Sequence, residues 1–234
     1  MRFHAVVPAA LLLGVAVAGG CRQSEQSRTQ ATATTTPAAV GTSHAETTLS
    51  AGAIGKRSEA QDHFDRSRAA FLKKDMKTAS TELHDAAVFM REHADSATGF
   101  AKALSARSSR ELDSLATKVG ASSVTSAASL DHVFAHANRA EAERHYELAT
   151  RAWKQRQTTR TGEELTMAMD HLERAAKDAH IALDSAATRA MDRSRAVADS
   201  LLQGGTAPNG VDDALKDLEL QLRRFGARLE NQRM

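Results

Sequence analysis

The feature that most constrains this chain of 234 residues is a long segment without proline. No proline occurs between Pro37 and Pro208. Proline interrupts the interiors of helices and central strands, so this segment permits long regular elements. Aromatic residues make up only 4% of the chain, whereas Ala, Leu, Glu, Lys, Arg and Gln are abundant. This composition favours helices and supplies few good strand formers. The chain is therefore predicted to be all-α.

Apolar residues recur at three- and four-residue spacing in three segments, as they do along one face of a helix. The stripes are Met76, Ala79, Leu83, Ala86, Met90, His93, Ala97, Phe100 and Leu104; Leu165, Met169, Leu172, Ala176, Ala179, Leu183, Ala186 and Ala190; and Val211, Leu215, Leu218, Leu222, Phe225 and Leu229. Together with glycine-rich breaks, they predict helices over 57–74, 76–119, 127–157, 161–203 and 211–231. We expect an antiparallel bundle of two long helical hairpins plus a C-terminal amphipathic helix.

The first 21 residues have the pattern of a secretory signal. A basic start is followed by an apolar run over residues 5–18, which is too short to span a bilayer, and then by Gly19, Gly20 and the chain's single cysteine, Cys21. The segment resembles a bacterial lipoprotein signal, in which small residues precede a cysteine that is acylated. The resemblance implies that cleavage removes residues 1–20 and that Cys21 anchors the chain to a membrane.

The domain organisation follows from composition. Residues 22–56 are rich in Thr, Ala, Ser and Gln, and they contain too few apolar side chains to fold alone. We predict a signal peptide over 1–20, a lipidated cysteine and disordered tether over 21–56, and a helical bundle domain over 57–234. The expected location is the cell envelope, at the outer membrane facing the periplasm in a Gram-negative host.

The helical part contains a weak internal repeat. Aligning His63 with His145, an offset of 82 residues, also aligns Glu82 with Glu164. A duplicated hairpin and shared helical periodicity both account for such matches. The segment Asp75-Met76-x-x-Ala79-x-x-x-Leu83-x-x-Ala86 resembles the second helix of a tetratricopeptide unit, and the domain more loosely resembles helical periplasmic proteins of the YfdX type. Neither resemblance carries a function to this chain.

Common catalytic motifs are missing from the sequence. It contains no nucleophile elbow, phosphate loop, HExxH or GxGxxG, and no Glu-x-x-His of the kind found in di-iron bundles. Its 31 basic and 29 acidic residues nearly balance, which argues against a nucleic-acid surface. We therefore expect no enzymatic activity, no cofactor, no nucleic-acid partner and no small-molecule substrate.

Five side chains are candidates for a metal site. His132 and His136 lie one turn apart and have the spacing of a half-site for zinc or copper. A helical wheel places them opposite an apolar stripe, which predicts exposed histidines instead. His93, Glu141 and His145 fall inside apolar stripes. They form either a polar layer, in which Glu141 and His145 pair one turn apart, or a metal- or proton-sensing site between helices.

Basic residues gather at the two predicted hairpin turns. They are Lys73, Lys74 and Lys77 at the first turn, and Lys154, Arg156 and Arg160 at the second. Such runs are commonly solvated helix ends; the alternative is a contact surface for anionic headgroups or an acidic partner.

The sequence therefore predicts a lipid-anchored, non-catalytic bundle with an interaction or envelope-structural role. Its expected partners are the membrane and either an unknown protein or a second copy of the chain. The alternative is a periplasmic metal-binding or stress-responsive bundle.

Overall fold

The computed structural model describes residues 59–204 and 209–232, and all regular structure within them is helical. The helices are α1 (Glu59–Leu72), α2 (Met76–Ser96), α3 (Gly99–Gly120), α4 (Ala128–Lys154), α5 (Thr158–Asp178), α6 (Ser185–Leu202) and α7 (Val211–Asn231). The prediction of an all-α helical bundle is confirmed. None of the described helices is both long and apolar enough to cross a membrane. The predicted signal peptide, Cys21 and the tether lie outside the described residues.

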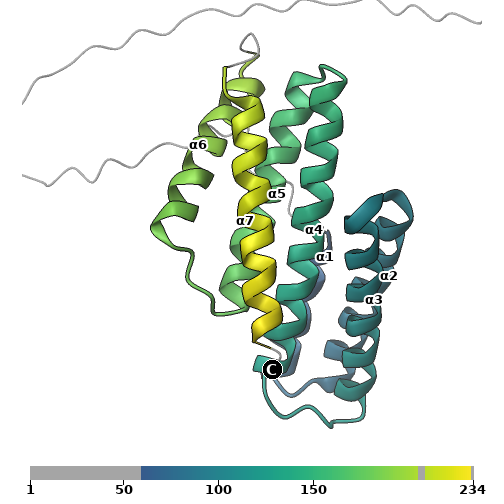
Figure 1. Cartoon of the computed structure of the whole chain (residues 1–234). Helices are drawn as coiled ribbons and strands as arrows, with labels where there is room; N and C mark the ends of the chain where they lie inside the picture. The colour runs from purple at the N-terminus through teal and green to yellow at the C-terminus, as the bar shows by residue number, and fades with distance from the viewer. Residues whose placement is uncertain (1–58, 205–208, 233–234) are drawn as a thin grey trace, which may run out of the picture. The chain divides into compact units, whose positions relative to one another are not determined.

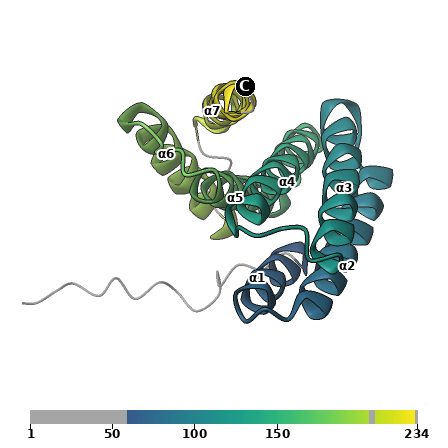
Figure 2. The ribbon, with the colours of Figure 1, turned by 90° about the horizontal axis from the view of Figure 1, so that it is seen from below.

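The central helix is α4, which lies between two groups of helices (Figures 1 and 2). Helices α1, α2 and α3 are on one side, and α5, α6 and α7 are on the other. The hydrophobic core is divided in the same way. Leu130 and Phe134 of α4 belong to the cluster with α1–α3, whereas Ala142 and Ala149 belong to the cluster with α5–α7. Both faces of α4 are therefore covered, so polar side chains on this helix become buried.

Residues 76–119 form two helices, not the single helix predicted. Ser96 ends α2 and Gly99 begins α3; the two residues between them are extended, and Gly99 has a left-handed φ of 51°. Glu147 of α4 accepts hydrogen bonds from the Thr98 hydroxyl at 2.9 Å and from the Ala101 amide at 3.1 Å. These bonds satisfy polar groups at the start of α3. The break therefore depends on a distant side chain, which the periodicity of the segment does not reveal.

Residues 161–203 are likewise divided, because α5 ends at Asp178 and α6 begins at Ser185. His180 has a left-handed φ of 53°, and the Asp184 carboxylate caps α6 by accepting a hydrogen bond from the Ala187 amide at 2.8 Å. Helix α5 also begins earlier than predicted, at Thr158. The prediction of two long hairpins is therefore wrong in its helix lengths, although the bundle itself is present.

The C-terminal helix α7 is an integral part of the bundle. It packs against α4, α5 and α6, and its predicted apolar stripe is buried. Gly226 on this helix lies against the Arg139 guanidinium of α4, so that a Cβ atom at residue 226 would clash with Arg139 Nη2 unless the arginine side chain moved. The absence of a side chain at residue 226 therefore leaves room for the Arg139 guanidinium between α7 and the central helix.

Candidate metal centre

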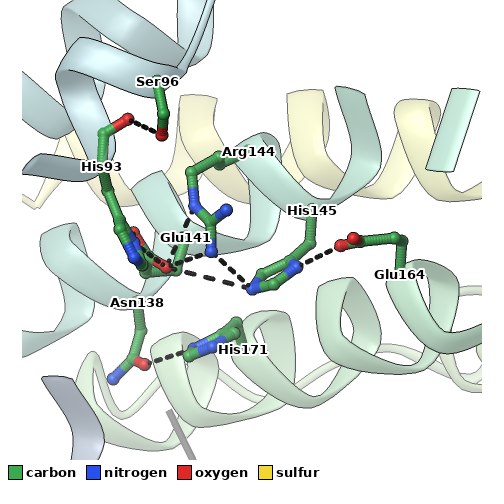
Figure 3. Close-up of polar contacts among 8 residues, drawn as sticks. All are labelled: His93, Ser96, Asn138, Glu141, Arg144, His145, Glu164 and His171. Atoms are coloured by element: carbon green, nitrogen blue, oxygen red, sulfur yellow. Dashed lines mark hydrogen bonds and ion pairs between the residues drawn. The ribbon is translucent and has the colours of Figure 1, made fainter. Parts of the chain in front are cut away.

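Buried polar side chains gather between α4 and α5, the two helices that run antiparallel through the middle of the bundle. Asn138, Glu141 and His145 lie at successive turns along one face of α4. Glu164 and His171 lie two turns apart on α5 and face them (Figure 3). The pairing of Asn138 with His171 and of His145 with Glu164 sets the antiparallel register. The site is therefore built on two helices rather than on loops.

Glu141 is fully buried and is the acidic centre of this group. His93 of α2 approaches with Nδ1 at 2.9 Å from Glu141 Oε2, and Arg144 donates to the same oxygen from Nη2 at 3.0 Å. Burial by itself would raise the pKa of the Glu141 carboxyl. The hydrogen bond from His93 and the positive charge of Arg144 outweigh this effect and hold that pKa well below its usual range. Glu141 is therefore a carboxylate.

His145 is held in one tautomer by its two neighbours. Arg144 Nη2 lies 2.9 Å from His145 Nε2, and because a guanidinium only donates, Nε2 must be the acceptor. The ring proton is then on Nδ1, which donates to Glu164 Oε2 at 2.7 Å. His145 Nε2 also lies 3.9 Å from Glu141 Oε2. The lone pair of His145 therefore points toward the centre of the group.

His171 is fully buried, and a chain of hydrogen bonds fixes its orientation. The Asn138 amide donates to Asp178 Oδ2 at 3.1 Å, which leaves Asn138 Oδ1 to accept from His171 Nδ1 at 3.0 Å. Arg68 of α1 in turn donates to Asp178 Oδ1 at 2.8 Å. His171 Nε2 is buried with no hydrogen-bond partner. Burial lowers the pKa of His171 to about 3, so the ring is neutral and Nε2 carries a free lone pair.

Glu141, His145 and His171 each offer a ligand atom, and these atoms all lie within 4.8 Å of one another. The two imidazole rings are stacked, with centroids 5.4 Å apart and planes inclined by 9°. Each ring donates its Nδ1 proton to an oxygen acceptor, which is how proteins usually orient metal-binding histidines. The arrangement therefore offers two imidazole nitrogens and one carboxylate to a shared ion.

The sequence identified part of this group. His93, Glu141 and His145 lie together as their positions in the stripes suggested, although the main partner of His145 is Glu164, and His93 is not one of the three convergent ligands. The sequence pattern does not identify His171, because its ring joins the group only when α5 packs against α4. The only sequence signal for a polar site residue on α5 is the alignment of Glu82 with Glu164.

The prediction that His132 and His136 are exposed is wrong: His136 has an exposed fraction of 5%, and His132 is half-buried. Residues 134–142 of α4 are all buried, because helices cover this part of α4 on more than one side. Burial, with the nearby charges of His132 and Arg107, lowers the pKa of His136 to about 4. The rings of His132 and His136 lie 4.8 Å apart, but neither residue joins a group of three possible ligands in the described part of the chain.

The internal repeat has a structural counterpart. His63 Nδ1 lies 2.7 Å from Glu82 Oε2, the same distance that joins His145 to Glu164. The bounds of α2 and α5 also differ by 82 residues at both ends. At the same offset, however, Phe89 stands where the second copy has His171. The first copy does form a group of His63, Glu82 and Asp85, but this group is only partly buried.

The six basic residues predicted at the turns are all exposed. They do not form one surface. Phe64 stacks on Phe134 and Arg68 pairs with Asp131, so α1 runs antiparallel to α4. The turn after α1 therefore lies toward the start of α4, whereas the turn after α4 lies at its end. These turns are separated by about the length of α4, roughly 40 Å.

Comparison with protein-family models, with curated proteins and with solved structures finds no match to this chain.

Proposed function

We propose that this protein is a non-catalytic helical bundle of the cell envelope that binds a divalent transition-metal ion through Glu141, His145 and His171. The observation that carries the proposal is the unpartnered Nε2 atom of His171. A buried nitrogen lone pair without a partner is costly, and native structures rarely leave one without a role. His171 itself belongs to a group with a second oriented imidazole and a carboxylate.

The donor set selects a class of ion. Imidazole nitrogens with one carboxylate suit zinc, cobalt, nickel and copper, whereas magnesium and calcium prefer oxygen ligands. Three protein ligands leave one position of a tetrahedral ion for water.

The proposal is tested by measuring zinc and cobalt binding to the full-length protein and to His171→Phe, which copies residue 89 of the first repeat. We expect about one equivalent to bind to the wild type, and affinity to fall about 100-fold or more in the variant, because one of three ligands is lost. His171→Gln preserves the side-chain volume better and should show the same loss of metal affinity. This variant tests the proposal if His171→Phe folds poorly.

His63→Ala is the matched control, because it removes the corresponding histidine of the first repeat. It should leave the high-affinity equivalent intact. The proposal is wrong if the wild type binds no stoichiometric metal, or if binding persists in both His171 variants. If His63→Ala loses metal binding and His171→Gln retains it, the metal site lies in the first repeat instead.

We further propose that Cys21 carries the lipid anchor that holds the bundle at a membrane, in accordance with the lipoprotein-like pattern of residues 1–21. The interaction or envelope-structural role predicted from the sequence remains compatible with this anchor. The buried donor set favours metal binding as the more specific proposal.

Replacing Cys21 with Ser is expected to abolish acylation and to leave the precursor uncleaved, since the thiol is the acceptor. Incorporation of labelled palmitate and the mass of the mature chain measure both effects. Labelling of Cys21→Ser at the wild-type level would contradict the anchor proposal.

A further inference from the structure

We propose that Arg144 is a built-in competitor for the metal: its guanidinium closes the site in the metal-free protein and withdraws when the ion enters. This inference rests on the proposed metal function and adds a means of regulating it. It arises because the side chain that completes the hydrogen bonding of the metal-free site binds to the same atoms that an ion would need.

The contacts of Arg144 define the competition. Its Nη2 atom donates to Glu141 Oε2 at 3.0 Å and to His145 Nε2 at 2.9 Å, and its Nε atom lies 3.3 Å from the same Glu141 oxygen. These contacts use the lone pairs of two of the three proposed ligands. The Nε2 lone pair of His145 cannot serve both the guanidinium and an ion. Two cations bound to one carboxylate oxygen in a buried site would also repel each other.

The position of Arg144 allows it to leave. Its side chain is 13% exposed, whereas Glu141 is fully buried, so the guanidinium lies at the edge of the group and the carboxylate lies inside it. A long, flexible arginine side chain can move its charged end into water while its stem stays packed. His93 would still donate to Glu141 from the opposite helix, so the carboxylate would remain oriented after the guanidinium has moved.

Arg144 should have opposite effects in the metal-free and in the metal-bound protein. Without metal, the guanidinium compensates the buried charge of Glu141 and stabilises the fold. With metal, the ion provides that compensation and the guanidinium only opposes binding. Removing Arg144 should therefore weaken the metal-free fold and strengthen metal binding. A residue with a purely structural role would not produce these opposite effects.

The test compares zinc and cobalt affinities of the full-length wild type and Arg144→Gln, measured by competition with a chromophoric chelator. We expect about 10- to 100-fold tighter binding in the variant, the range that corresponds to the loss of one charged hydrogen bond. Its midpoint of thermal unfolding without metal should be lower than that of the wild type. Arg144→Lys keeps the charge but loses the forked geometry, so its metal affinity should lie between those of the wild type and Arg144→Gln. This variant tests the proposal if Arg144→Gln folds poorly.

Arg66→Gln is the matched control. Arg66 contacts His63 Nδ1 at 2.9 Å and Glu82 Oε2 at 2.9 Å in the first repeat, so its loss should leave the affinity unchanged. Equal or weaker binding by both Arg144 variants, with intact wild-type binding, would overturn the competitor while the metal function stands. Absence of binding in the wild type and in all variants would overturn both. Binding by Arg144→Gln but not by the wild type would contradict the proposed metal function, because the wild-type site would then not admit the ion.

Discussion

Deleting residues 206–234, which include α7, is expected to unfold the half of the bundle that contains α5 and α6. Six large apolar side chains of α7 are buried in the core of this half: Val211, Leu215, Leu218, Leu222, Phe225 and Leu229. Burial of each contributes about 1.5–3 kcal/mol. The net stability of a domain is only about 5–15 kcal/mol. Circular dichroism should therefore show a loss of helix greater than α7 itself accounts for.

Single substitutions in α7 also test how much this helix contributes to the stability of the bundle. Leu222→Ala removes a fully buried side chain and should reduce the free energy of unfolding by about 2–5 kcal/mol. Leu220→Ala, on the exposed side of the same helix, should change it by about 0.5 kcal/mol or less. If the truncated chain keeps its stability and merely changes from a dimer to a monomer, α7 is an association helix and its docking on the bundle is wrong.

Replacing Glu141 with Gln is expected to abolish high-affinity metal binding and to destabilise the metal-free protein. The amide keeps the shape of the side chain but removes the only charged ligand of the three. Binding should weaken by about 100-fold or more. The free energy of unfolding should fall by about 3 kcal/mol, because Arg144 loses its buried counter-charge. Chelator competition and chemical denaturation measure the two effects.

Glu163→Gln is the control for this substitution, since Glu163 is an exposed glutamate on α5 beside the site. It should change neither affinity nor stability measurably. If Glu141→Gln retains wild-type affinity, Glu141 is not a ligand, and the buried group is a polar layer that stabilises the contact between α4 and α5.

The fold was largely predictable from the sequence because helical periodicity is a local property. The bounds of α7 were predicted correctly, because a glycine-rich segment directly precedes its leucine stripe. The breaks inside 76–119 and 161–203 were not predicted, because apolar spacing continues across them. The first break depends on Glu147, which is 46 residues away from the Ala101 amide it caps. The second carried a readable signal, the N-cap Asp184.

The candidate site was predictable only in part, for a related reason. Glu141 and His145 share one helix face, so their proximity follows from spacing alone. His171 and the hydrogen bonds that fix its tautomer come from a second helix, and no single-helix pattern places them. The exposure predicted for His136 failed because a helical wheel assumes one solvent-facing side, and α4 has helices on both sides.

X-ray absorption spectroscopy of the zinc-loaded full-length protein tests the central claim most directly, because it identifies the atoms around the ion. We expect two imidazole nitrogens and carboxylate oxygen at about 2.0–2.2 Å, and His171→Gln should remove one of the imidazoles from any metal that remains bound. A coordination shell made only of oxygen, or one with two imidazoles that persist unchanged in His171→Gln, would contradict the assignment of Glu141, His145 and His171 as the metal site.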